Sequence, residues 1–173
     1  MTNVLVTGGA GFIGRNIVDS SIEDGHNVVI IDNLSSGRRE NVNEKAVLVQ
    51  DDLAEQNCAL RICELYNIEL IHHVAARPRV TYSIDYPVQT TQENIANTVT
   101  VLDAARQTNV KRVVYSASSS AYGNTVVFPT PEDRASARAT VSPYALQKYV
   151  GEEFCRMFSQ LYGLDTVCLR YFN

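Results

Sequence analysis

Several features that point to other classes of protein are missing from this sequence of 173 residues. No apolar run approaches the length of a membrane-spanning helix, so we expect no membrane association. The net charge is −4, which provides no electrostatic basis for binding nucleic acid. The first residues enter a strand pattern at once and leave no room for a signal peptide. We therefore expect a cytoplasmic protein.

Cysteine is sparse, and its spacing is uninformative about metals. No Cys-x-x-Cys pair and no spacing typical of zinc occurs. We predict reduced thiols and no metal site. Internal repeats, low-complexity runs and interdomain linkers are also missing, and the length suits one domain over residues 1–173. The cysteines are Cys58, Cys63, Cys155 and Cys168.

Short β-branched runs alternate with longer amphipathic stretches along the chain. This alternation predicts an α/β protein with a Rossmann-type, doubly wound parallel sheet and helices on both faces. Val28–Ile31 is continuously apolar, as expected for a strand covered on both sides. The predicted strands cover 4–7, 28–32, 47–50, 70–74, 112–116 and 166–170. The predicted helices begin near Gly11, Leu53, Glu93 and Pro143.

Two proline-containing segments depart from this alternation, Arg77–Pro87 and Gly123–Ser142. Both are predicted to be loops. Each follows a predicted strand, so each should lie at the carboxyl edge of the sheet, where ligands bind in open α/β folds.

A glycine-rich turn lies between the first predicted strand and the first predicted helix. Gly8 can make the tight turn, Gly11 lets backbone amides approach a phosphate, and Gly14 lets the helix pack against the strand. The helix N-terminus would then present unpaired N–H groups to a pyrophosphate. The spacing is GxxGxxG, and glycines also serve ordinary turns.

An acidic residue, Asp32, ends the second predicted strand. Its carboxylate can accept both ribose hydroxyls of a dinucleotide and repel a 2′-phosphate, which favours NAD over NADP. The alternative is a turn or helix-cap aspartate. Arg38 and Arg39 can accept a phosphate or be solvated loop charges. One aspartate of Asp51-Asp52 can meet an adenine amino group, or it can cap the next helix.

Tyr144 and Lys148 are spaced to share one face of the last predicted helix. A nearby ammonium group favours the phenolate form of tyrosine, so Tyr144 can act as a base toward an alcohol. The alternative is a surface tyrosine beside a solvated lysine. A run of serines follows the fifth predicted strand; we expect Ser120 to face the substrate with Ser118 in support, although serines also make ordinary loop hydrogen bonds.

These motifs together resemble the extended short-chain dehydrogenase/reductase family. Within that family the chain is similar to the NAD-dependent epimerases and dehydratases that act on nucleotide sugars, and most of all to the UDP-glucose 4-epimerase group. The resemblance runs from Thr7 to Asn173. Its motifs are Thr7–Gly14, Asp32–Gly37, His73–Ala76, Ser118–Gly123, Tyr144-x-x-x-Lys148 and Arg170–Asn173.

The resemblance implies NAD as the cofactor and a set of residues that bind it. Asn94 would brace the loop on the cofactor side, and Lys148 would bind a ribose as well as assist Tyr144. The residues implied at the cofactor are Gly8, Gly11, Phe12, Ile13, Gly14, Asp32, Asn33, Leu34, Ser35, Ser36, Gly37, Asp52, Leu53, Val74, Ala75, Ala76, Asn94, Ser118, Tyr144 and Lys148.

For the substrate, the resemblance implies a UDP-hexose and a homodimeric isomerase. Tyr144 would be the base, Lys148 its partner, Ser120 a contact to the sugar, and Asn173 a contact to the diphosphate. The stretch Ser118–Tyr122 carries no carboxylate, which favours 4-epimerisation over the related decarboxylases and dehydratases. A non-catalytic NAD-binding module is the third reading.

The chain departs from the family pattern at three places. Asn97-Thr98 stands where Gly-Thr is usual, and Gln147 replaces a serine often found before the lysine. Family members continue beyond Asn173 into a substrate domain, which is absent here. We therefore expect either a fragment or a shortened NAD-binding protein, with one wall of the sugar pocket missing and negligible epimerase activity by itself.

Overall fold

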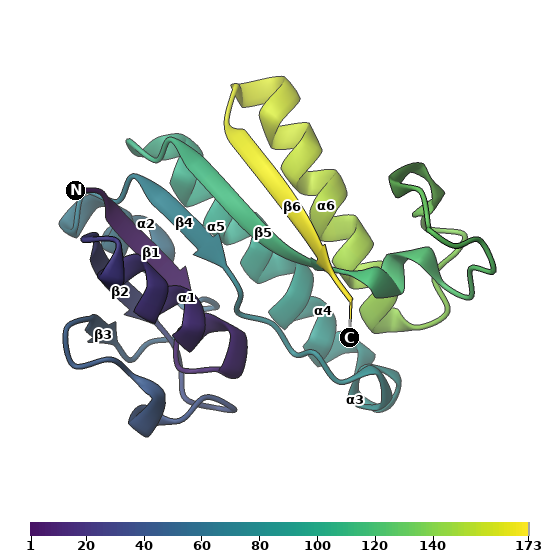
Figure 1. Ribbon diagram of the computed structural model, residues 1–173, viewed down its shortest axis with the longest axis horizontal. Helices are drawn as coiled ribbons and strands as arrows, with labels where there is room; N and C mark the ends of the chain where they lie inside the picture. The colour runs from purple at the N-terminus through teal and green to yellow at the C-terminus, as the bar shows by residue number, and fades with distance from the viewer. Residues whose placement is uncertain (173) are drawn as a thin grey trace.

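The computed structural model describes residues 1–172 and contains a single parallel sheet. Its strands are β1 (Asn3–Thr7), β2 (Asn27–Ile31), β3 (Val47–Val49), β4 (Leu70–His73), β5 (Arg112–Ser118) and β6 (Asp165–Tyr171). The strand order is β3-β2-β1-β4-β5-β6. The chain steps outward from β1 to β3 and then from β4 to β6, which is the doubly wound arrangement predicted from the sequence (Figure 1).

Helices connect the strands. The α-helices are α1 (Phe12–Glu23), α2 (Cys58–Leu65), α3 (Val80–Asp85), α4 (Pro87–Thr91), α5 (Asn97–Gln107) and α6 (Pro143–Tyr162). The short turns are the π-helical η2 (Gln92–Ala96) and the 3-10 turns η1 (Arg39–Asn41), η3 (Ser119–Tyr122) and η4 (Glu132–Arg134). In the described part of the chain, none of these helices is long and apolar enough to cross a membrane.

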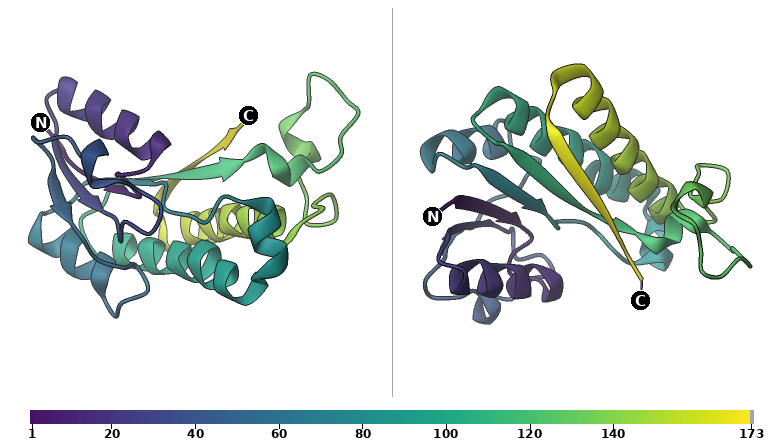
Figure 2. Two further views of the ribbon diagram at one scale, coloured as in Figure 1. Left: turned by 90° about the horizontal axis from the view of Figure 1, so that it is seen from below. Right: turned by 45° about the horizontal axis from the view of Figure 1, so that its top comes forward.

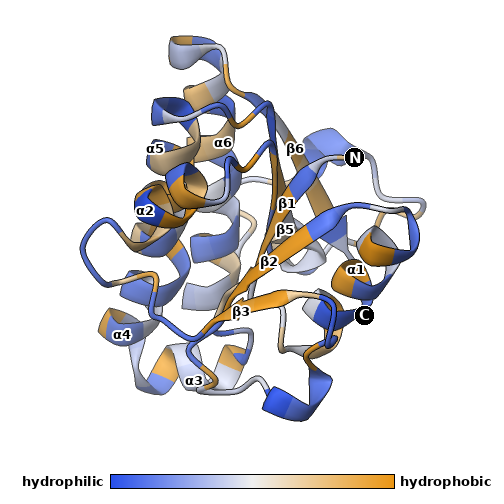
Figure 3. Ribbon diagram, turned by 90° about the vertical axis from the view of Figure 1, so that its left-hand side faces the viewer, coloured by the Kyte–Doolittle hydropathy of each residue, from blue (hydrophilic) through white to orange (hydrophobic). Residues whose placement is uncertain are grey.

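The sheet is covered on both faces, but unequally. Figure 2 shows α1 on one side of the sheet and α2, α5 and α6 on the other. On β1, Val4 and Val6 pack in the cluster that contains Val18 of α1, whereas Leu5 joins the larger cluster beneath α2, α5 and α6. Successive strand residues point to opposite faces, so a strand buried on both sides is apolar throughout. The hydropathy colouring of β1 and β2 in Figure 3 follows this rule.

The predicted helix near Leu53 is wrong in its start. Residues 53–57 form turns, and α2 begins at Cys58 after Asn57, whose φ is +58°. Asp52 holds this turn by accepting the Ala54 N–H at 2.9 Å. Asp52 therefore caps a local turn and not the helix that follows.

The predicted helix near Glu93 is also wrong in its start. It begins at α4, where Pro87 takes the first helical position, and it continues through η2 into α5. The segment Arg77–Pro87, predicted to be a loop, contains the short helix α3. Gly123–Ser142 is irregular apart from η4, as predicted. All four cysteines are free thiols.

Candidate active site

The glycine turn connects the carboxyl end of β1 to α1. Gly8 makes the turn with φ of +71°, and a Cβ there would lie 2.8 Å from the Ala75 nitrogen. A Cβ on Gly14 would lie 2.1 Å from the Gly8 oxygen, so only glycine allows α1 to start this close to the turn. Gly11 is the N-cap of α1. Phe12 and Ile13 follow it with exposed side chains.

The start of α1 is open. Among the described residues no side chain caps its first turn, and no acidic residue lies in that turn. The first N–H groups of the helix therefore keep their hydrogen-bonding capacity and the positive end of the helix dipole. This end of α1 is suited to an anionic ligand.

Asp32 lies directly after β2 and faces the glycine turn. Its Oδ2 accepts the Ala10 N–H at 3.0 Å, and its Oδ1 accepts the Leu34 N–H at 2.8 Å. A Cβ on Gly37 would lie 3.0 Å from Oδ1. Asp32 thus makes the bonds of a turn aspartate, and those same bonds hold its carboxylate beside the turn.

The segment after Asp32 is tied to the end of the next strand. Asn33 donates from Nδ2 to Asp52 Oδ2 at 2.8 Å and accepts the Ser35 N–H at 3.0 Å. Ser36 is exposed, whereas Leu53 is buried. These polar groups line one side of the sheet edge next to the glycine turn.

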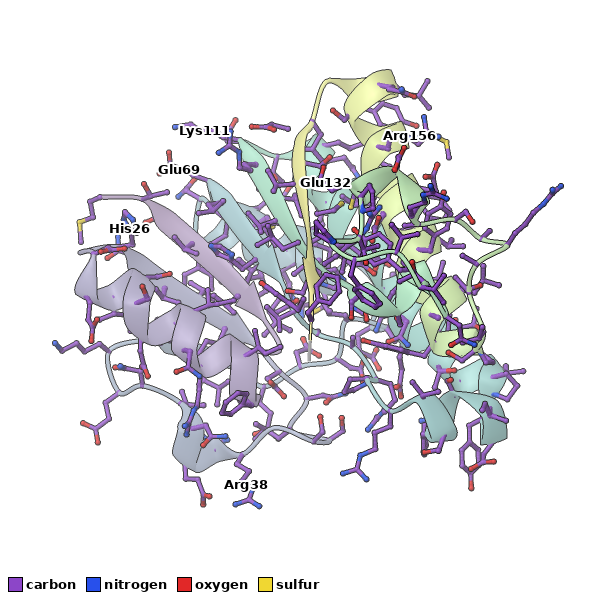
Figure 4. The ribbon with its side chains drawn as sticks, turned by 45° about the vertical axis from the view of Figure 1, so that its right-hand side comes forward. His26, Arg38, Glu69, Lys111, Glu132 and Arg156 are labelled. Atoms are coloured by element: carbon purple, nitrogen blue, oxygen red, sulfur yellow. The ribbon has the colours of Figure 1, made fainter. Side chains whose placement is uncertain are left out.

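The two arginines of this region pair with exposed neighbours. Arg38 forms an ion pair with Glu40 at 3.2 Å, and Arg39 donates to Gln50 Oε1 at 2.6 Å. Figure 4 shows Arg38 at one end of the molecule and the pair Glu69–Lys111 at the other. Their exposure agrees with solvated loop charges.

A buried hydrogen-bond chain joins β1, β4 and α5. The Thr7 hydroxyl lies 2.7 Å from His73 Nδ1 and accepts the N–H groups of Val74 and Ala75 at 3.2 Å. His73 Nε2 lies 3.0 Å from the Thr98 hydroxyl, which donates to the Asn94 carbonyl. Because the Thr98 proton is used there, His73 donates from Nε2 and accepts at Nδ1. This series of hydrogen bonds holds the backbone at the start of the Val74–Ala76 edge. The sequence alone did not predict a structural role for His73.

Asn94 is buried within the π-helical turn η2. Its Oδ1 accepts the Arg77 N–H at 2.7 Å, and its Nδ2 donates to the Arg77 carbonyl at 3.2 Å. Arg77 also pairs with Glu93 at 2.7 Å. Asn94 therefore holds the backbone that follows Ala76.

Tyr144 and Lys148 lie in the first turns of α6. The Ser142 hydroxyl caps this helix by accepting the Ala145 N–H at 3.1 Å, and the Ser83 hydroxyl accepts the Tyr144 N–H at 3.1 Å. Lys148 is buried, and its Nζ donates to the Ser116 carbonyl at 2.8 Å. Lys148 is therefore a structural partner of β5 and not a solvated surface lysine.

The serine run forms the turn η3 at the end of β5. Ser118 caps it by accepting the Ser120 N–H at 3.2 Å and the Ser120 hydroxyl at 2.8 Å. Ser118 is also the serine of this turn whose side chain lowers the pKa of the Tyr144 phenol. Ser118 and Ser120 are thus joined by a hydrogen bond at the end of β5, and the expectation that Ser120 faces the substrate stays a prediction.

Comparisons with known proteins agree with this arrangement. Residues 4–173 match the model of the NAD dependent epimerase/dehydratase family. The chain belongs to this family. It is 37% identical over 171 residues to a putative UDP-glucose 4-epimerase of Methanocaldococcus jannaschii, covering 98% of this chain and 55% of the relative. It is 40% identical over 167 residues to a UDP-glucose 4-epimerase of Mycolicibacterium smegmatis, covering 93% and 52%.

Solved structures of epimerases have the same fold. UDP-glucose 4-epimerase of Thermotoga maritima, crystallised with UDP-glucose, matches with a TM-score of 0.94 and 38% identity over 98% of this chain and 55% of that one. The enzyme of Brucella ovis, crystallised with NAD, matches with a TM-score of 0.94 and 34% identity over 100% and 52%. The chain spans about half the length of the curated relatives it matches.

The electrostatics of the epimerase/dehydratase site differ from the sequence expectation in one respect. Burial raises the pKa of the Tyr144 phenol, and the hydrogen bond with Ser118 lowers it by less. The Lys148 ammonium donates to the Ser116 carbonyl and lies 4.8 Å from the centre of the Tyr115 ring. The residues of this chain by themselves keep Tyr144 protonated at neutral pH.

Burial also lowers the pKa of two basic groups of the site. It lowers the pKa of Lys148 to about 8. It lowers the pKa of His73 to about 3, with a smaller contribution from the Lys148 charge, so the imidazole is neutral at physiological pH. The remaining predicted site residue, Asn173, lies outside the described residues.

We expect the buried Lys148 ammonium to make folding pH-dependent. Below about pH 8 both folded and unfolded chains hold this proton, so burying the charged ammonium lowers the free energy of unfolding by its full amount. Between about pH 8 and 10.5 only the unfolded chain holds it, and the cost disappears. The free energy of unfolding of Lys148→Met minus that of the unsubstituted chain should therefore fall by about 3 kcal/mol across this range.

Urea denaturation of both proteins at several pH values measures this difference. Lys45→Met, at an exposed lysine, is the matched control and should give a constant difference. A constant difference for Lys148→Met as well would contradict the buried ammonium.

Proposed function

We propose that this chain is the cofactor-binding part of an NAD-dependent nucleotide-sugar 4-epimerase of the UDP-glucose/UDP-galactose type. The observation that carries the proposal is the meeting of two sites at one sheet edge. The glycine turn lies at the carboxyl end of β1, and Ser118 lies at the carboxyl end of β5, where the turn η3 contacts α6. A dinucleotide held at the first site can reach a sugar held at the second.

The residues around the glycine turn fit NAD. The close approach at Gly8 and Gly14 leaves a backbone cradle that side chains would fill, and the uncapped start of α1 offers N–H groups to a pyrophosphate. Asp32 would accept the hydroxyls of the adenosine ribose. Asn33–Gly37, Asp52, Leu53 and the Val74–Ala76 edge would line the rest of the cleft. When bound, NAD supplies a reversible hydride acceptor and a positively charged ring.

Tyr144 would take the proton from the sugar C4 hydroxyl and return it after the sugar has turned over. Its raised pKa means that this chain's residues hold the phenol protonated, so the positive charge of bound cofactor is needed to favour the phenolate. Lys148, whose Nζ is bonded to the Ser116 carbonyl, would bind the adjoining ribose and assist the tyrosine. These roles require both side chains on one helix face, as α6 provides.

Ser118 is the better candidate for orienting the reacting oxygen. Its side chain lowers the pKa of the Tyr144 phenol, whereas the Ser120 hydroxyl donates to Ser118 at 2.8 Å. Ser120 would then hydrogen-bond Ser118 and also contact the sugar. Asn173 remains a proposed contact to the substrate diphosphate.

Epimerisation is favoured over dehydration and decarboxylation by the composition of this edge. The stretch Ser118–Tyr122 contains no carboxylate, so it supplies no additional acid for elimination. A transient oxidation at C4 needs one proton-transfer group and a hydride acceptor. The substrate would be a UDP-hexose, as in the Thermotoga maritima structure.

The outer faces of α4 and η2 support a homodimer, and we also propose that it is cytoplasmic. A hollow on this surface is lined by Pro87, Val88, Thr91, Gln92, Ile95 and Ala96. Val88 is 85% exposed, and Leu161 on α6 is 65% exposed. Apolar surface of this kind marks protein contacts. A second copy of the chain would cover it.

We expect the chain to bind NAD(H) more tightly than NADP(H), because Asp32 would repel a 2′-phosphate. Asp32→Asn keeps an oxygen that can accept from Ala10 or Leu34 and removes the charge. It should reduce the preference about tenfold or more, since like charges a few ångströms apart near a surface cost about 1 to 4 kcal/mol. Titration calorimetry with both dinucleotides measures this; equal affinities for the unsubstituted chain would refute the role of Asp32.

We expect Tyr144→Phe to abolish turnover while NAD stays bound. The assay needs a complete sugar pocket, so residues 1–172 are joined to the second half of the Thermotoga maritima epimerase, whose matching half superposes on this chain with a TM-score of 0.94. The chimera should interconvert UDP-glucose and UDP-galactose, and Tyr144→Phe should lose at least about 100-fold in kcat. Tyr149→Phe, on the same helix, is the matched control. A folded, NAD-binding chimera without activity would favour the non-catalytic module.

We expect Val88→Lys to shift the chain from dimer to monomer, because it places a charge in the proposed contact. Val126→Lys changes a valine that is 88% exposed elsewhere on the molecule and serves as control. Light scattering after size-exclusion chromatography measures the mass. A monomeric unsubstituted chain would rule out the dimer.

A further inference from the structure

Gln147 directly precedes Lys148, and its side chain is buried. Only 3% of the residue is exposed, although an amide inside a protein must find partners to offset its lost hydration. The proposed catalytic groups do not use it. Its neighbours therefore indicate what it does.

The Gln147 amide is fully used. Its Oε1 accepts the Asn94 Nδ2 group at 2.8 Å. Its Nε2 donates to the hydroxyl of Thr90 at 3.0 Å and to that of Thr91 at 3.2 Å. One side chain of α6 thus binds the end of α4 and the π-helical turn η2 at the same time.

Asn94 extends this link to the cofactor edge. Its amide is bonded to the N–H and the carbonyl of Arg77, the residue after Ala76. A continuous path of hydrogen bonds therefore runs from the backbone beside Ala76, through Asn94, to the residue before Lys148. The path crosses η2, where an interrupted helix lets a buried side chain bind neighbouring backbone.

We infer that Gln147 is a positioning residue, which holds Tyr144 and Lys148 in place relative to the Val74–Ala76 edge of the cofactor cleft. This inference rests on the proposed function for its catalytic meaning, but the positional claim concerns this chain alone. Hydrogen bonds between buried side-chain amides suit this positioning role. Sliding of α6 would break them and leave buried donors and acceptors unsatisfied, so they oppose such sliding. A serine at this position would be too short to reach all three partners.

The test replaces Gln147 by methionine, which keeps the length of the side chain and removes every hydrogen bond. Gln160→Met changes an exposed glutamine of the same helix and is the matched control. Tyrosine labelled with carbon-13 at Cζ reports the titration of each phenol by NMR, and Tyr144→Phe identifies the signal of Tyr144. These measurements use the chain itself and do not depend on turnover.

We expect Gln147→Met to shift the pKa of Tyr144 by about 0.5 or more, because α6 moves and the surroundings of the phenol change. Gln160→Met should leave it unchanged. In the chimera, Gln147→Met should lower kcat at least about tenfold with KM changed less, as misplaced catalytic groups do. A role confined to stability would lower the melting temperature without moving the Tyr144 titration.

An unchanged Tyr144 pKa in folded Gln147→Met would overturn the inference. If that variant does not fold, the double change Thr90→Val with Thr91→Val removes both acceptors of the amide while retaining shape, and it should likewise shift the Tyr144 titration. An inactive chimera combined with a shifted titration would reject the proposed function and support the positioning role. An active chimera combined with an unshifted Tyr144 titration would support the proposed function and reject the positioning role of Gln147.

Discussion

The parallel register of β1, β4 and β5 is the constraint on which the site depends. Thr7 pairs with His73, and His73 pairs with Tyr115, so the carboxyl ends of three strands meet at one edge. The glycine turn, the Val74–Ala76 segment and the serine turn leave from that edge. A slip of one residue would turn the buried side chains of a strand to the opposite face. The apolar clusters on both faces oppose such a slip.

Buried polar groups then join elements that the apolar core leaves free to slide. The Thr7–His73–Thr98 chain links β1, β4 and α5, and Asn94 and Gln147 link η2 to α6. Lys148 adds a link from α6 to β5. Each bond is directional, so together they select one arrangement among many that would bury similar apolar area. This is how a hydrophobic core gains the precision that a catalytic site requires.

Burial acts in opposite directions on the pKa values of the basic groups and of the phenol in this site. Burial lowers the pKa of Lys148 to about 8 and that of His73 to about 3, and it raises the pKa of Tyr144. A base that is protonated until a cofactor arrives would act only when a hydride acceptor is present. Within the proposed function, this coupling limits unproductive proton transfer. The same burial makes stability depend on pH.

The sequence by itself determined the elements whose signals are local. The apolar periodicity of β1 to β6, the glycine turn and the four-residue spacing of Tyr144 and Lys148 are readable because side-chain direction repeats regularly along a strand or helix. The position of Asp32 was predictable for the same reason, because it follows the apolar pattern of β2. Only the tertiary structure decided that α2 starts at Cys58, that the Ser120 hydroxyl donates to Ser118, and that Gln147 binds Asn94. Those outcomes depend on contacts between residues up to 53 positions apart, as in the bond from Asn94 to Gln147, and no local pattern encodes which partners meet.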